Sequence, residues 1–147
     1  MPDHTATEVL ARGYFVIHFT CGRTWGDKQG GCEVFPAPFA VFLTGNEKTY
    51  MEPDISVICD KNKITDKGCQ GAPDWIIEIV PPSSKQMDYY KKMFQYRTAG
   101  VREYWVVDPD REIVTVYNFG QDSMEEYPFG VEAPVGIYEG FSICVSL

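Results

Sequence analysis

Apolar and polar positions alternate clearly in the middle of the chain. Residues 54–59 alternate and are rich in β-branched side chains, a pattern that is typical of a strand. Residues 75–80 are apolar throughout except for Glu78. Such a run suits a central strand that is covered on both faces. The middle of the chain therefore predicts a sheet with one carboxylate placed inside a buried strand.

Further short apolar runs predict the rest of the sheet. Segments of the same kind occur at residues 32–35, 39–43, 103–107 and 113–117, and further short strands are expected around residues 123–127 and 143–147. A turn at residues 108–111 joins two of them into a hairpin, and residues 60–74 predict a polar loop. The first 31 residues fit a helix or a strand equally well and contain a glycine-rich stretch.

One helix is predicted between the two most apolar strands. Ser83 or Ser84 can cap a helix that runs to about residue 99, and Gly100 follows its end. The apolar stripe on this helix consists of Met87, Tyr90 and Phe94, and a neighbouring stripe consists of Asp88, Lys92 and Tyr96.

The order of these elements predicts a mixed sheet. A strand–helix–strand crossover through residues 84–99 implies one parallel pair, whereas the remaining connections resemble hairpins. We therefore expect an α/β (α+β) fold. At 147 residues the chain is most simply a single domain, residues 1–147, with an atypical region at residues 1–31.

Composition narrows the class of protein. No apolar run approaches the roughly 20 residues of a membrane-spanning helix, and the N-terminus lacks a signal core, so we expect a cytoplasmic protein without membrane contact. The five cysteines include no Cys-x-x-Cys pair, which predicts reduced thiols and no zinc site. A net charge of −8 argues against a protein that simply coats nucleic acid.

Three residues carry the candidate chemistry. Asp54 begins one predicted strand, Glu78 lies inside another, and Lys92 is on the following helix. Two carboxylates and an ammonium group could share a divalent cation and a water molecule, which is the minimal equipment for hydrolysing a phosphodiester. The structural alternatives are a turn residue for Asp54 and a solvated helix residue for Lys92. Glu78 fits a structural role less well, because a glutamate is seldom buried without a partner.

The order and spacing of several motifs resemble the Uma-two family, whose members are similar in fold to the PD-(D/E)xK restriction endonucleases. The resemblance rests on residues 51–60, on residues 71–84, on Asp88, on residues 92–96 and on residues 100–109. It extends from about Cys32 to Tyr117 and continues more weakly to the end of the chain.

This resemblance implies a restriction-endonuclease-like mixed β-sheet flanked by helices and a nuclease that uses Mg²⁺ (or Mn²⁺) on DNA. Asp54 and Glu78 would bind the metal, and Lys92 would be the catalytic lysine. The wider superfamily places its lysine two residues after the glutamate, where this chain has Val80. Asp88 would orient Lys92, and Ser83 would cap the helix, with a secondary role near phosphate.

Two departures keep an alternative function open. Family members usually have Asp and Arg where this chain has Ala40 and Phe42, and a helical N-terminal segment that is not evident here. The alternative is a catalytically inactive relative that serves as a binding or assembly module. Strands such as residues 114–117 also allow a homodimer. Lys61, Lys63 and Lys67 belong to a solvated loop or contact a nucleic-acid backbone.

Overall fold

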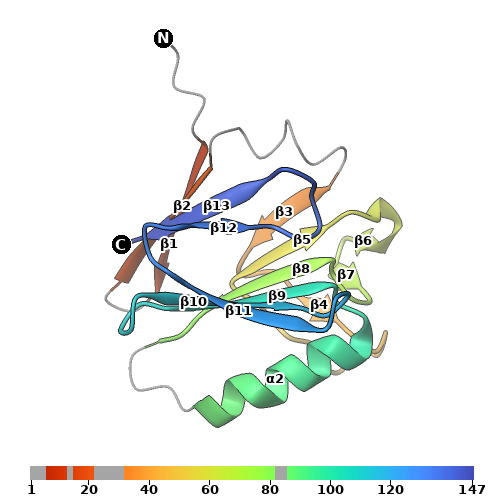
Figure 1. Cartoon of the computed structure of the whole chain (residues 1–147). Coiled ribbons are helices and arrows are strands. Elements are labelled where there is room, and N and C mark those ends of the chain that lie inside the picture. Colours follow the sequence, from red (N-terminus) through yellow and green to blue (C-terminus); the bar gives the residue numbers. More distant parts are fainter. Residues whose placement is uncertain (1–5, 13–14, 22–31, 82–85) are drawn as a thin grey trace.

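The computed structural model describes residues 6–12, 15–21, 32–81 and 86–147. Its elements form three layers, with helix α2 (Gln86–Ala99) along one face of a central sheet and strands of a second sheet over the other face (Figure 1). No helix among the described residues is long and apolar enough to cross a membrane.

The central sheet has six strands and mixed topology. In spatial order they are β11 (Ser123–Pro128), β10 (Ile113–Asn118), β9 (Glu103–Asp108), β8 (Trp75–Ile79), β5 (Ile55–Ile58) and β3 (Glu33–Pro36). Strands β8 and β9 are parallel and are connected through α2, whereas all other neighbours in this sheet are antiparallel. The predicted mixed sheet and its helical crossover are therefore confirmed.

Two smaller sheets complete the described structure. A four-stranded sheet contains β1 (Ala6–Arg12), β2 (Phe15–Cys21), β13 (Ser142–Ser146) and β12 (Glu132–Pro134). A three-stranded sheet contains β4 (Val41–Phe42), β7 (Gly68–Gln70) and β6 (Ile64–Thr65), next to the short 3-10 helix η1 (Lys61–Lys63). The described part of the N-terminal region is thus a β-hairpin, and the predicted loop at residues 60–74 contains three short elements.

Successive side chains of the central strands point to opposite faces of the sheet and pack into two separate hydrophobic cores. Trp75, Ile77 and Ile79 of β8 pack with residues of β12 and β13 on the face opposite α2. Ile76 lies on the other face, in a cluster with Tyr96 of α2 and Tyr104 of β9. Glu78 follows Ile76 by two residues and therefore faces the helix. A carboxylate on a covered strand requires hydrogen-bond donors from the elements around it.

The orientation of α2 differs from the prediction. Tyr90 and Phe94, assigned to the apolar stripe, are 51% and 63% exposed, whereas Tyr96 is completely buried. The stripe that contains Lys92 and Tyr96 faces the sheet, because both side chains bind Glu78 there. The proposed capping serines and the side chain of Met87 lie outside the described residues.

The prediction that all cysteines are reduced is wrong. Cys32 and Cys59 form a disulfide across a sequence separation of 27 residues. Cys32 precedes β3 and Cys59 follows β5, and the adjacent register pair is Glu33 with Ile58. The bridge therefore joins the ends of two neighbouring antiparallel strands. The single sequence gave no sign of it, because the pairing of β3 with β5 brings the two cysteines together.

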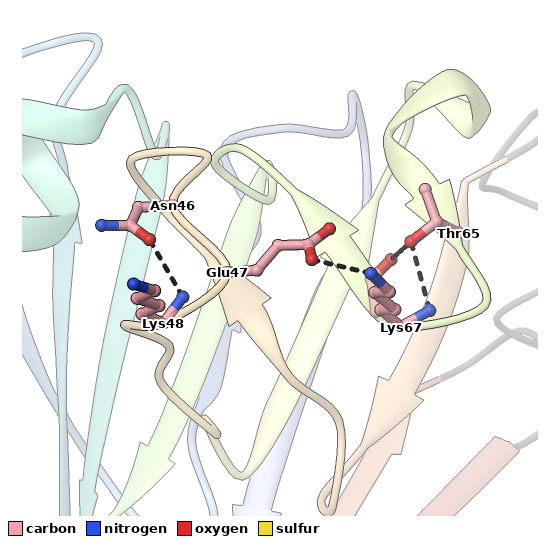
Figure 2. Close-up of polar contacts among 6 residues, drawn as sticks. Asn46, Glu47, Lys48, Thr65 and Lys67 are labelled. Atoms are coloured by element: carbon pink, nitrogen blue, oxygen red, sulfur yellow. Dashed lines mark hydrogen bonds and ion pairs between the residues drawn. The ribbon is translucent and has the colours of Figure 1, made fainter.

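The lysines of residues 61–67 have partners within the chain. Lys67 donates to Glu47 at 2.7 Å, which ties two loops together, and the backbone nitrogen of Lys67 donates to Thr65 (Figure 2). The ammonium of Lys63 donates to the carbonyl oxygen of Ala72 at 2.9 Å. Lys61 lies 4.0 Å from Glu33. These contacts favour a structural role for this loop.

Candidate active site

Asp54 and Glu78 lie opposite each other on neighbouring strands. The antiparallel register pairs Ile55 of β5 with Ile77 of β8, so the next pair along is Asp54 with Glu78. Residues directly opposite in such a pair face the same side of the sheet, with Cβ atoms about 5 Å apart. Both side chains are buried, Asp54 at 7% exposure and Glu78 at 4%. The fold thus brings together two carboxylates from separate segments of the chain.

Three donors surround the carboxylate of Glu78. Tyr104 of β9 donates its hydroxyl to Oε2 at 2.7 Å. Tyr96 of α2 donates to Oε1 at 3.1 Å, and Nζ of Lys92 lies 3.4 Å from the same oxygen. A buried carboxylate is costly unless it is hydrogen-bonded and paired. These donors offset that cost and fix the direction of the side chain.

Lys92 reaches the site from the helix layer. Its side chain is 37% exposed, whereas that of Glu78 is almost fully buried, so Lys92 is the member of this ion pair that solvent reaches. Nζ also lies 5.3 Å from the centroid of the Tyr89 ring. Val80, at the position of the superfamily lysine, carries no charge. The helix therefore supplies the cation that the strand lacks.

Asp54 also connects the strands. Its carboxylate oxygen Oδ2 accepts a hydrogen bond from the backbone nitrogen of Ile79 at 2.7 Å. Its carbonyl oxygen accepts from the backbone nitrogen of Ala37 at 2.8 Å. The bond to Ile79 joins the start of β5 to the end of β8, which positions Asp54 beside Glu78.

The two tyrosines remain proton donors near neutral pH. Burial, and after it the charge of Glu78, raises the pKa of Tyr96 and of Tyr104 above the usual range of the phenol. From the sequence, Tyr96 was placed on the helix stripe of Asp88 and Lys92 without a role in binding Glu78, and Tyr104 was assigned no role. The only indication of these donors in the sequence was Glu78 itself, because a glutamate inside an apolar strand requires hydrogen-bond donors from neighbouring elements.

The donor set suits a hard divalent cation. Mg²⁺ binds carboxylate oxygens and is commonly held by one or two carboxylates, together with water and substrate phosphate. Asp54 and Glu78 supply two such groups on one face. Among the described residues, no group of three or more His, Cys, Asp or Glu side chains could hold a metal ion. The hydroxyl of Ser56, fully buried on the same face of β5, has no hydrogen-bond partner in this part of the chain.

Of the remaining predicted site residues, the structure describes only Asp88. Asp88 is exposed on α2, and within the described structure no ion pair joins it to Lys92. Ser83 lies outside the described residues. Phe42, at one of the two departures from the family pattern, is buried in β4 with its ring 5.9 Å from that of Tyr50. Ala40 accepts a backbone hydrogen bond from Cys69. Both positions therefore support the small sheet.

Comparisons with known proteins found a solved structure and a family model that resemble this chain. The chain is similar to the crystal structure of a protein described as a putative nuclease belonging to DUF820, from Anabaena variabilis ATCC 29413. The sequences are 26% identical, with a TM-score of 0.57, over 74% of this chain and 62% of that chain. This chain thus spans less than two thirds of that protein's length. No curated protein matches it. The family model described as Uma2, putative restriction endonuclease, matches residues 17–145, and the chain therefore belongs to that family.

Proposed function

We propose that this protein is a metal-dependent endonuclease that hydrolyses DNA phosphodiester bonds. One observation carries the proposal: two buried carboxylates, Asp54 and Glu78, are register neighbours on one sheet face, with the ammonium of Lys92 3.4 Å from Glu78. Membership in a family of restriction-endonuclease type supports this reading of the three groups.

The proposed roles follow from the positions of these residues. Asp54 and Glu78 would hold Mg²⁺ or Mn²⁺, which when bound polarises a phosphoryl oxygen and lowers the pKa of a coordinated water molecule. Tyr96 and Tyr104 orient the carboxylate of Glu78 through their hydroxyl groups. Lys92 is the exposed member of the set, so its ammonium can stabilise the negative charge that develops on the phosphate in the transition state.

Plasmid nicking with variants of single residues tests the proposal. Purified protein in Mg²⁺ or Mn²⁺ should nick supercoiled DNA, and Asp54→Asn, Glu78→Gln and Lys92→Met should each lower the rate by about 100-fold or more. Lys91→Met is the matched control, because Lys91 is an exposed lysine on the same helix. Circular dichroism establishes that each variant is folded. Equal nicking by the wild type and the three site variants would refute the proposal.

One observation favours a second candidate, a catalytically inactive relative that binds a partner. Both oxygens of Glu78 already accept hydrogen bonds, so a cation has to compete with Lys92 and two tyrosines. Isothermal titration with MgCl₂ and MnCl₂ distinguishes the two functions. Stoichiometric binding that Glu78→Gln abolishes supports the endonuclease, whereas no binding of either ion supports the inactive relative.

A further inference from the structure

A groove of about 350 Å³ opens beside the candidate active site. Val80 and Pro81, which directly follow β8, belong to its lining, and Val106 contributes from β9. Val106 is the register partner of Glu78. Tyr89, whose ring lies 5.3 Å from Nζ of Lys92, also lines the groove. The groove therefore shares residues with the immediate surroundings of Glu78 and Lys92.

Aromatic side chains provide flat surfaces in and around this groove. Tyr90 of α2 and Tyr117 of β10 both belong to its lining. The ring of Tyr117 is stacked on that of Tyr104, with centroids 6.0 Å apart and an interplanar angle of 20°. Tyr104 in turn donates to Glu78. A series of aromatic rings thus extends from the candidate metal ligand into the groove, and Tyr90, which also lines the groove, is half exposed.

The charged groups of the groove favour a ligand without phosphate. Asp108, Asp110 and Glu126 contribute carboxylates to the lining, against the single guanidinium of Arg111. A phosphate group would meet an excess of negative charge there. A carboxylate instead accepts hydrogen bonds from the exocyclic amino group of a base, and an arginine donates to base nitrogen and oxygen acceptors. Base rings stack on aromatic side chains with about 1–3 kcal/mol per base.

We propose that this groove receives one unstacked base of the substrate strand, and that it prefers bases with an exocyclic amino group. The inference rests on the proposed endonuclease function, since the sugar–phosphate backbone of that nucleotide then passes Lys92 and Glu78. The base stacks against Tyr90 and contacts the edge of the Tyr117 ring, which lies against the rings of Tyr104 and Phe119. Its amino group donates to Glu126, since Oδ1 of Asp108 already accepts hydrogen bonds from the backbone of residues 110 and 111. The groove thereby selects the nucleotide next to the cleaved bond.

Binding of free deoxynucleosides tests the groove separately from catalysis. Deoxycytidine, deoxyadenosine and thymidine carry no phosphate, so their binding requires neither a metal ion nor cleavage. In saturation-transfer-difference NMR on the full chain, deoxycytidine and deoxyadenosine should give signals at least threefold stronger than thymidine, which lacks an exocyclic amino group. Glu126→Gln should reduce this preference.

Two aromatic residues of α2 make a matched pair of variants. Tyr90→Ala should lower the nucleoside signals at least threefold, whereas Phe94→Ala should leave them unchanged, because Phe94 is more exposed and does not line the groove. Equal losses in both variants, or equal signals for the three nucleosides, would overturn the proposal. A protein that nicks DNA but binds no nucleoside refutes only the groove. One that binds them but never nicks DNA refutes the endonuclease.

Discussion

Two buried glutamates, Glu78 and Glu103, have different kinds of hydrogen-bond partner. Glu78 faces the helix layer and is bound by two phenols and an ammonium group. Glu103, at the start of β9, faces the opposite layer and is 1% exposed. It accepts hydrogen bonds from the backbone nitrogen of Gly136 at 2.7 Å and from the indole of Trp105 at 3.0 Å. Within the described part of the chain no ion pair involves Glu103, whereas the ammonium of Lys92 lies 3.4 Å from Glu78.

Glu103 should make stability depend on pH. Burial raises the pKa of its carboxyl from 4.5 to about 7, against the lowering effect of its two hydrogen bonds. Between those pH values the unfolded chain releases this proton while the folded protein retains it. The free energy of unfolding should therefore fall as the pH rises from about 4.5 to about 7, by up to about 3 kcal/mol.

Urea unfolding across this pH range measures the effect, with Glu103→Gln as the comparison. The variant cannot titrate at this position, so the corresponding decrease in unfolding free energy should disappear from its pH profile. Because other groups titrate equally in both proteins, only the difference between the profiles is informative. Parallel profiles for the wild type and Glu103→Gln would contradict the assignment.

At the scale of elements, burial explains what the sequence could predict. Strands β5, β8, β9 and β10 were predicted because their apolar periodicity directly reflects two covered faces. The short strands β6, β7 and β12 have only two or three residues each, too few to show a period. Their pairing depends on partners distant in the chain, as does the disulfide.

The candidate site was predictable to a similar extent. A carboxylate inside an apolar strand identified Glu78 as unusual, and the family resemblance favoured a functional role for Asp54 and Lys92 over their structural alternatives. Local sequence did not indicate Tyr96 and Tyr104 as its donors, because Tyr104 lies on the parallel neighbour of β8. The predicted apolar stripe of α2 was also wrong. The helix turns Lys92 and Tyr96 toward the sheet, where both bind the buried carboxylate of Glu78.

Two alanine substitutions on α2 test this orientation. Tyr96→Ala removes a completely buried ring and a hydrogen bond to Glu78, and should lower the free energy of unfolding by about 3–5 kcal/mol. Phe94→Ala, two residues earlier, removes a ring that is 63% exposed and should change it by about 0.5 kcal/mol or less. Urea denaturation measures both, and a larger loss for Phe94→Ala would show that the predicted stripe faces the sheet.

The disulfide should stabilise the edge of the central sheet. Closing a loop of this length restricts the unfolded chain, and the Cys32→Ser, Cys59→Ser double variant should lose about 3 kcal/mol of unfolding free energy. Cys144→Ser is the control, because Cys144 is a half-buried free thiol. Denaturation in the presence of dithiothreitol should destabilise the wild type but not the double variant. Equal stability of the oxidised wild type and the double variant would contradict a structural role.

At the scale of the whole molecule, charge determines how the protein meets DNA. The chain carries a net charge of −8, and the described lysines of residues 61–67 are each near an acceptor within the chain. With 21 acidic side chains against 13 lysines and arginines, we expect few contacts that displace counterions from the phosphate backbone. The candidate site adds to this repulsion, since Asp54 and Glu78 bring two carboxylates against one lysine.

Divalent metal should consequently control DNA affinity. In EDTA, fluorescence anisotropy with a labelled 20-base-pair duplex should show weak binding that depends only slightly on NaCl concentration. The slope of log K against log salt is expected to be shallow, because it scales with the number of phosphates that the protein neutralises. Adding Ca²⁺, Mg²⁺ or Mn²⁺ should tighten binding by at least tenfold if the ion neutralises the carboxylate pair. Asp54→Asn should weaken that metal effect, whereas Asp88→Asn, an exposed carboxylate on α2, should leave it unchanged. Tight binding in EDTA with a steep salt dependence would instead place the DNA contact on a basic surface away from Asp54 and Glu78.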